Sequence, residues 1–199
     1  MNPIPIGRLL RANTTGCALG CKVTQGSTPS FGDMVIIPLT NQNKIYGLVY
    51  DIHIDDDGLV NQLAAADISR EIIEDNRRNR NVPVEMSVAF IGWEDPQGRV
   101  HHTRVPYPPL TLDEIFQCDD EEVRKFTQNG SFGYLRAVLR NPELPVVDLV
   151  TAHLRQILAA RSGIDAGQAL EASLVEVIAM LKDDYPQMMD VLSAVSEIL

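Results

Sequence analysis

Short apolar segments alternate with polar turns through the first half of the chain, and this pattern is typical of β-strands. The turns between the segments are rich in glycine, proline, asparagine and aspartate, which favour tight reversals of the chain. We expect the longest of these strands to carry a bulge near Gly47. The predicted strands cover residues 6–13, 17–24, 34–37, 44–54, 82–94 and 99–105.

The period of the pattern changes between the fourth and fifth predicted strands. In residues 59–79, apolar side chains such as Leu63, Ile68 and Ile72 fit one face of a helix, and charged side chains fit the other. We therefore predict a helix inserted between strands.

After the proline cluster at residues 106–109, the pattern becomes helical to the end of the chain. Apolar stripes on the last two helices require a partner surface, which could be the barrel, the neighbouring helix or another subunit. The residues that we assign to this partner surface are Leu174, Val177, Met188, Met189 and Leu192. The predicted helices cover residues 119–127, 132–139, 146–161, 166–184 and 185–199.

These elements predict an α+β fold. A small closed antiparallel β-barrel of about six strands, with the inserted helix, is expected in residues 1–110, and an α-helical C-terminal region in residues 111–199. Closure into a barrel is expected because an open sheet of this size would leave its edge strands exposed.

Composition narrows the classes of protein to consider. The chain has 199 residues, of which 45% are hydrophobic, enough for a sizeable core. The formal net charge of -10 opposes non-specific binding to nucleic acid. No apolar run reaches the about 18 residues of a membrane span, and the N-terminus lacks the apolar core of a signal peptide, so we expect a cytoplasmic protein. The three cysteines do not suggest a disulfide framework.

The residue types that usually carry chemistry do not form a convincing site. Cys17 and Cys21 would lie about 13 Å apart on one strand, too far for a shared zinc ion, and are expected to be buried. His101 and His102 would face opposite ways on a strand, and His153 is expected to be packed within a helix. No phosphate-binding loop with its lysine occurs. We therefore expect no catalytic residue, no cofactor and no metal, and a protein that is not an enzyme.

The densest basic run contains Arg77, Arg78 and Arg80, separated by asparagines. It could contact nucleic-acid phosphates, or it could be the solvated, cationic end of the inserted helix. The second interpretation is favoured, because the whole chain is acidic.

The order of several motifs in the first half is informative. Residues 6–9 open the chain with Ile-Gly-Arg-Leu, Gly-Asp at 32–33 precedes an apolar strand, and Gly-x-Val follows at 47–49. A later strand at 84–92 leads to the sequence Arg-x-Pro-x-Pro-Pro at 104–109. This series resembles the HAS-barrel, a domain shared by HerA-type hexameric DNA translocases and the N-terminal domains of ATP synthase catalytic-ring subunits.

The resemblance extends through residues 132–136 and 146–154 and covers residues 6–154. The translocases then continue into a phosphate-binding loop, whereas residues 155–163 of this chain lead into a helical pattern. No Walker lysine, Walker B strand or arginine finger can be transferred. In those assemblies the barrel is an oligomerising crown and a docking surface. The resemblance therefore implies a non-catalytic assembly protein that self-associates or docks onto a HerA-like ATPase.

Two other functions stay open at this point. A nucleic-acid-binding barrel of OB-like character would use the basic run at 76–81, with Tyr46, Tyr50 and Trp93 as stacking side chains. A cryptic hydrolase or metal enzyme ranks last.

Overall fold

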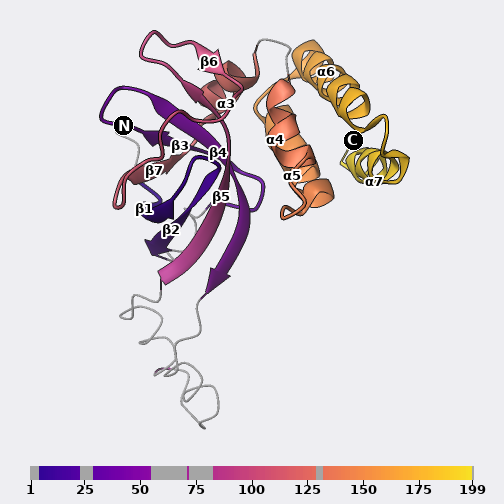
Figure 1. The fold of residues 1–199 in the computed structure, drawn as a ribbon. Helices are drawn as coiled ribbons and strands as arrows, with labels where there is room; N and C mark the ends of the chain where they lie inside the picture. Colours follow the sequence, from indigo (N-terminus) through magenta and orange to yellow (C-terminus); the bar gives the residue numbers. More distant parts are fainter. Residues whose placement is uncertain (1–4, 23–28, 55–70, 72–82, 129–131, 199) are drawn as a thin grey trace.

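The computed structural model describes residues 5–22, 29–54, 71, 83–128 and 132–198 (Figure 1). Within them, six antiparallel strands close into a β-barrel in the order β2-β1-β7-β3-β4-β5, and β5 pairs with β2 to complete the circle. The strands of the barrel are β1 (Gly7–Ala12), β2 (Gly16–Lys22), β3 (Met34–Pro38), β4 (Lys44–Ile54), β5 (Pro83–Glu94) and β7 (Glu114–Gln117). The predicted α+β fold with a closed barrel is confirmed.

One barrel strand differs from the prediction. The segment predicted as a strand at 99–105 forms only β6 (Val100–His101), which pairs with the end of β5 outside the barrel. Val105 instead turns into the barrel interior. The place of the sixth strand is taken by β7, which pairs with β1 and β3. The barrel therefore extends past the expected boundary at residue 110.

The barrel is buried on both faces along β3 to β5. Val35 and Ile37 point into the barrel, where they join side chains from all six strands. Met34 and Ile36 point outward, where helices cover them. A strand with both faces buried gives a continuous apolar run rather than an alternating one, and this explains the sequence Met-Val-Ile-Ile at 34–37.

The expected bulge near Gly47 is confirmed. The pairing of β4 with β5 shifts register between Tyr46 and Gly47, and again between Val49 and Asp51. A Cβ atom at Gly47 would lie 2.4 Å from a methyl carbon of Val88, so only glycine fits this close approach without rearrangement.

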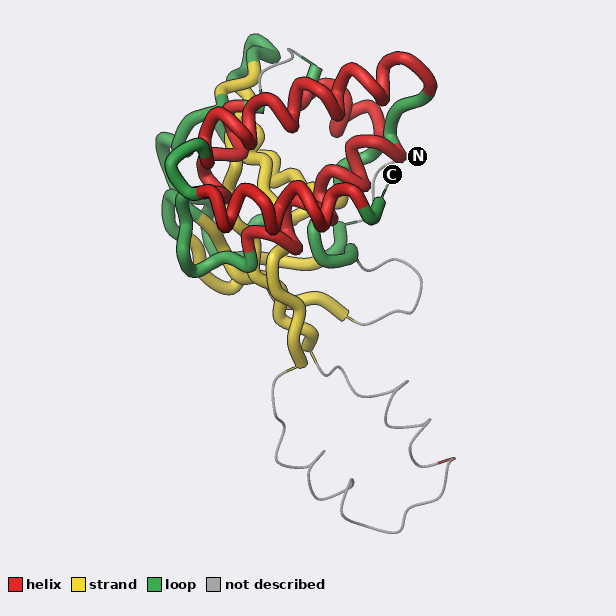
Figure 2. The backbone as a smooth tube through the Cα atoms, turned by 90° about the vertical axis from the view of Figure 1, so that its right-hand side faces the viewer, coloured by secondary structure: helices red, strands yellow, loops and turns green. Residues whose placement is uncertain are grey.

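The helices follow one another along the chain to the C-terminus. Figure 2 views the molecule from the helical side, so that the helices lie in front of the strands. The helices are α3 (Asp120–Thr127), the 3₁₀ turn η1 (Gly133–Leu135), α4 (Arg136–Leu139), α5 (Val146–Ala159), α6 (Gly163–Leu181) and α7 (Tyr185–Ser196). Each helical segment predicted after residue 111 is confirmed, although the segment 132–139 divides into η1 and α4. In Figure 1, α5 lies between the barrel and the outer pair α6 and α7.

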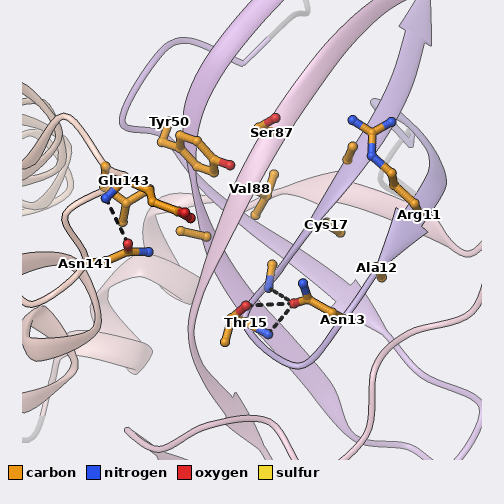
Figure 3. Close-up of a pocket in the computed structure, with 14 residues that line it drawn as sticks. Arg11, Ala12, Asn13, Thr15, Cys17, Tyr50, Ser87, Val88, Asn141 and Glu143 are labelled. Carbon is orange, nitrogen blue, oxygen red and sulfur yellow. Dashed lines mark hydrogen bonds between the residues drawn. The ribbon is translucent and has the colours of Figure 1, made fainter.

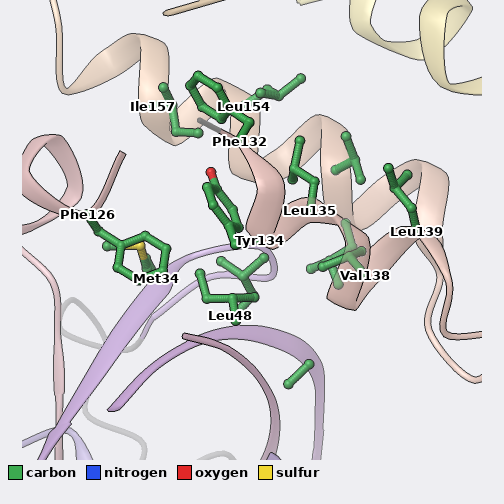
Figure 4. Packing of buried hydrophobic residues seen from close by; sticks show 14 of the residues in the cluster. Met34, Leu48, Phe126, Phe132, Tyr134, Leu135, Val138, Leu139, Leu154 and Ile157 are labelled. Carbon is green, nitrogen blue, oxygen red and sulfur yellow. The ribbon is translucent and has the colours of Figure 1, made fainter. Parts of the chain in front are cut away.

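A single apolar cluster joins the barrel wall to these helices (Figure 4). Met34 and Leu48 contribute from the barrel, and Phe126, Tyr134 and Leu154 contribute from the helical side. Tyr134 is completely buried, and its ring makes an edge contact with Phe126 at a centroid distance of 5.1 Å. The helical region is therefore part of the same core as the barrel.

The inserted helix predicted at 59–79, and with it Arg77, Arg78 and Arg80, lies outside the described residues, apart from the isolated Glu71.

Helix α3 begins with a capping box. The side chain of Asp119 accepts a hydrogen bond from the Glu122 amide at 2.8 Å, and the Glu122 carboxylate accepts one from the Asp119 amide at 3.1 Å. We expect Asp119→Ala to lower the free energy of unfolding by about 1 kcal/mol, because it leaves helix amides without partners. Urea unfolding measures this, with Glu121→Gln, which keeps the cap, as the control. A loss of equal size in both variants would contradict the assignment to the cap.

Candidate functional site

A pocket of about 420 Å³ lies between the barrel and α4. Its walls come from four separate parts of the chain: the β1–β2 turn, β5, the segment after β6, and α4 with the two residues that follow it. Its apolar part is formed by Ala89, Phe90 and Ile91 of β5. We call it the arginine pocket, after Arg104, Arg136 and Arg140, which line it.

The charged residues that line this pocket are all basic. Three arginines line it together with His102, and none of its described lining residues is acidic. Arg136 and Arg140 lie one helical turn apart, and Arg136 donates a hydrogen bond to the backbone carbonyl of His102. Arg104 and Arg140 are exposed and form no ion pair with any described residue. The pocket therefore concentrates positive charge in a chain with 27 acidic and 17 basic residues.

A second pocket of about 290 Å³ adjoins the first and shares Thr15, Ala89 and Asn141 with it. Figure 3 shows that Asn13 organises the β1–β2 turn in its wall. The Asn13 side-chain oxygen accepts hydrogen bonds from the Thr15 amide, the Thr15 hydroxyl and the Gly16 amide, at 2.7, 2.8 and 2.9 Å. These three bonds fix the turn that forms one wall of both pockets.

A loop at residues 106–113, which we call the proline loop, exposes apolar side chains. Tyr107, Leu110 and Leu112 are 66%, 66% and 61% exposed, and Leu10 of β1 is 46% exposed. Leu112 has a φ of 71°, in the left-handed region that leucine rarely adopts. Its amide donates to the Leu9 carbonyl at 2.9 Å, which ties the loop to the barrel.

A buried polar pair lies where α5 meets the barrel. The Tyr134 hydroxyl and Nε2 of His153 are 2.9 Å apart, and both side chains are completely buried. Burial lowers the pKa of His153 to about 4 and raises that of Tyr134 well above its ordinary value. The imidazole is therefore neutral at pH 7, and its Nε2 atom shares a hydrogen bond with the tyrosine hydroxyl.

A second buried polar cluster surrounds Glu94 at the end of β5. The carboxylate lies 2.7 Å from the Lys125 ammonium and 3.6 Å from that of Lys44, and it accepts a hydrogen bond from the Tyr46 hydroxyl at 3.0 Å. Burial acts to raise the pKa of Glu94, but the hydrogen bonds from Lys125 and Tyr46 and the lysine charges outweigh it and lower the pKa. The cluster connects α3 to the barrel.

The structure places the cysteines and histidines as the sequence predicts. Cys17 and Cys21 are buried inside the barrel, and burial raises the pKa of the Cys17 thiol to about 12. The Nε2 atom of His101 lies 3.1 Å from the Asp95 carboxylate, whereas that of His102 lies 3.2 Å from the Phe126 carbonyl oxygen, so the two rings have separate environments. His153 is packed. Among the described residues, no group of three or more potential ligands could hold a metal ion.

The residues assigned to a partner surface divide into two groups. Val177 is completely buried in the core that α6 shares with α5 and α7, so its partner lies within this chain. Leu174, Met188 and Leu192 are half-buried, and Met189 is 43% exposed. Only the second group can contact another protein.

The stacking side chains of the nucleic-acid alternative need a correction. Tyr46 is completely buried against Phe126, because the outer face of β4 is covered by helices. Trp93 is half-buried and stacks on His101 at a centroid distance of 4.2 Å. Tyr50 is half-buried and lines the smaller pocket.

Sequence reasoning missed the arginine pocket, because its residues are distant in the chain. One signal was present: Arg136 and Arg140 have the spacing at which like charges repel on a helix. Such a pair suggests that something outside the helix compensates the charge.

Among the described residues, no helix has both the length and the apolar character that a membrane crossing needs. No protein-family model matches this chain, and no curated protein matches it significantly.

Proposed function

We propose that this chain is a non-catalytic assembly protein that docks onto another protein through the proline loop. The observation that carries the proposal is the presentation of Tyr107, Leu110 and Leu112 to solvent by a loop that is tied to the barrel. Clustered apolar side chains on a protein surface are typical of interaction sites.

The conformation of Leu112 supports this interpretation. A leucine in the left-handed region costs about 1 kcal/mol or more relative to glycine, and an exposed leucine gains nothing from burial to offset that cost. Hydrogen bonds hold the loop in this form: the Leu112 amide donates to Leu9, and the Leu110 amide donates to the Asp113 carboxylate at 2.8 Å. Backbone strain of this kind often accompanies a binding role.

The partner follows from the sequence resemblance. A HAS-type barrel without an attached motor is expected to associate with a HerA-like ATPase, and the closed six-stranded barrel is compatible with that resemblance. We therefore propose a HerA-type hexameric ATPase as the docking partner.

Replacing Leu112 with asparagine tests the docking surface. Asparagine tolerates the left-handed backbone and removes the exposed apolar side chain. We expect binding to a purified HerA-type ATPase from the same organism to weaken at least about tenfold, as apolar contact residues at interface centres often cost more than 1 kcal/mol. Biolayer interferometry measures the affinity, and thermal unfolding should show no loss of stability.

The matched control is Ile178→Asn on α6, which removes an exposed apolar side chain that is 44% accessible. This variant should bind as the wild type does. Absence of any complex with the ATPase in native mass spectrometry would refute the proposed partner. Equal affinity of the Leu112 variant would refute the proposed surface.

The nucleic-acid alternative has less support. Tyr46 is buried in the core and cannot stack on a base. Nε1 of Trp93 already donates a hydrogen bond to the Thr103 hydroxyl at 3.2 Å.

A further inference from the structure

We infer that the arginine pocket binds the phosphate group of a small phosphorylated ligand. This role goes beyond docking, because the pocket is lined by residues that are distinct from those of the proline loop.

The charge balance of the pocket is the first argument. Arg104, Arg136 and Arg140 bring three permanent positive charges to one cavity, and no described lining residue offsets them. Like charges that line one cavity repel each other, and an anion bound between them is attracted by all three. Guanidinium groups bind phosphate oxygens with two parallel hydrogen bonds, so arginine suits this task better than lysine.

The neutral residues of the pocket also fit a phosphate. Thr14 and Thr103 both line it, and hydroxyl groups are common donors to phosphate oxygens. The Thr103 hydroxyl accepts a hydrogen bond from Trp93, which leaves its own proton available to donate. The adjacent turn is fixed by Asn13, so part of the binding wall is preorganised before a ligand arrives.

The dimensions and surroundings favour a small ligand over a nucleic-acid strand. A volume of about 420 Å³ suits a small molecule, and the apolar side chains of Ala89, Phe90 and Ile91 can contact its organic part. A nucleic-acid strand would need a basic surface that continues beyond the pocket. The adjoining pocket instead contains one acidic residue, Glu143, and one basic residue, Arg11, and the chain as a whole has a net charge of -10.

Isothermal titration calorimetry with the full chain tests the inference, using inorganic phosphate, sulfate, AMP and a twelve-nucleotide oligothymidylate as probes. We expect saturable binding of phosphate and tighter binding of AMP. Arg104→Gln and Arg140→Gln should each weaken AMP binding at least about tenfold, since each removes charged hydrogen bonds. Both side chains are exposed, so both variants should fold. The matched control is Arg155→Gln on α5, an exposed arginine outside the pocket, which should bind AMP as the wild type does.

Backbone amide shifts in NMR spectra locate the binding, and those of Thr14 and Thr103 should move on addition of AMP.

No saturable binding of either phosphate or AMP would overturn the inference. Binding that is equally strong in the Arg104 and Arg140 variants would do the same. Tighter binding of the oligonucleotide than of AMP would assign the pocket to nucleic acid instead. Equal affinity for sulfate and phosphate would show only a general anion site and would also overturn the inference. Leu112→Asn should bind AMP normally. A failure of the phosphate inference can therefore be told apart from a failure of the docking proposal.

Discussion

Replacing Gly32 with alanine should lower the free energy of unfolding by about 2–5 kcal/mol. Gly32 has a φ of 86°, where a non-glycine residue costs about 1–2 kcal/mol. In addition, a Cβ atom there would lie 2.4 Å from the Cβ of Ala152 on α5, and overpacking typically costs a further 1–3 kcal/mol. Urea unfolding followed by circular dichroism measures the loss.

Two further variants separate these costs. Gly98 also has a positive φ, of 79°, but a Cβ there would have its nearest neighbour at 3.9 Å, so Gly98→Ala should show the backbone cost alone. Ala152→Gly removes the clashing methyl group, and should recover part of the stability lost in Gly32→Ala when the two are combined. An equal loss of unfolding free energy in Gly32→Ala and Gly98→Ala would contradict the close approach of α5 to the barrel at Gly32.

Acid should destabilise the protein between pH 6.5 and pH 4 because of His153. Its folded pKa of about 4 lies below the ordinary value of 6.5, so the unfolded chain binds more protons in this range. The free energy of unfolding must therefore fall as the pH falls, by about 3 kcal/mol across the window. Burial also lowers the pKa of His102, which adds to the loss in the same direction.

Carboxyl groups complicate the total pH dependence, so a difference between variants is decisive. Burial raises the pKa values of Asp33 and Glu122, and these groups act in the opposite sense at acid pH. We expect His153→Gln to be less stable than the wild type at pH 7. Its disadvantage should shrink by about 3 kcal/mol by pH 4, because glutamine does not titrate. Urea unfolding at several pH values measures the difference, with the partly exposed His101→Gln as the control. A constant difference at all pH values would contradict the burial of a neutral imidazole.

The regular elements could be predicted because their signals are local. The helices α5 to α7 carry apolar stripes over many residues, and the long strands β4 and β5 are bounded by clear turns. By contrast, β7 has only four residues and follows a proline cluster, so its sequence Glu-Ile-Phe-Gln is too short to show the alternation of a strand. It is a strand because it pairs with β1 and β3, and that pairing forms only when the barrel closes.

The candidate site was out of reach of the sequence for a related reason. Thr14, Arg104 and Arg140 belong to segments that meet only after the barrel closes and α4 packs against it. One segment supplies Arg104 and another supplies Arg136 and Arg140, and only the spacing of the second pair is a signal in the sequence. The run at 76–81 attracted attention because its charges are close in the sequence, whereas Arg104 joins Arg136 and Arg140 only in the folded chain.

The circular pairing of the barrel limits how copies or partners can add to it. Each of its six strands already has a neighbour on both sides, and β6, the remaining strand of the described residues, has only two residues. Main-chain hydrogen bonding of an incoming peptide along the barrel would require an existing pair of strands to separate. Recognition of this protein should therefore depend on its side chains. Single substitutions can then change its binding partner during evolution without altering the pairing of the strands.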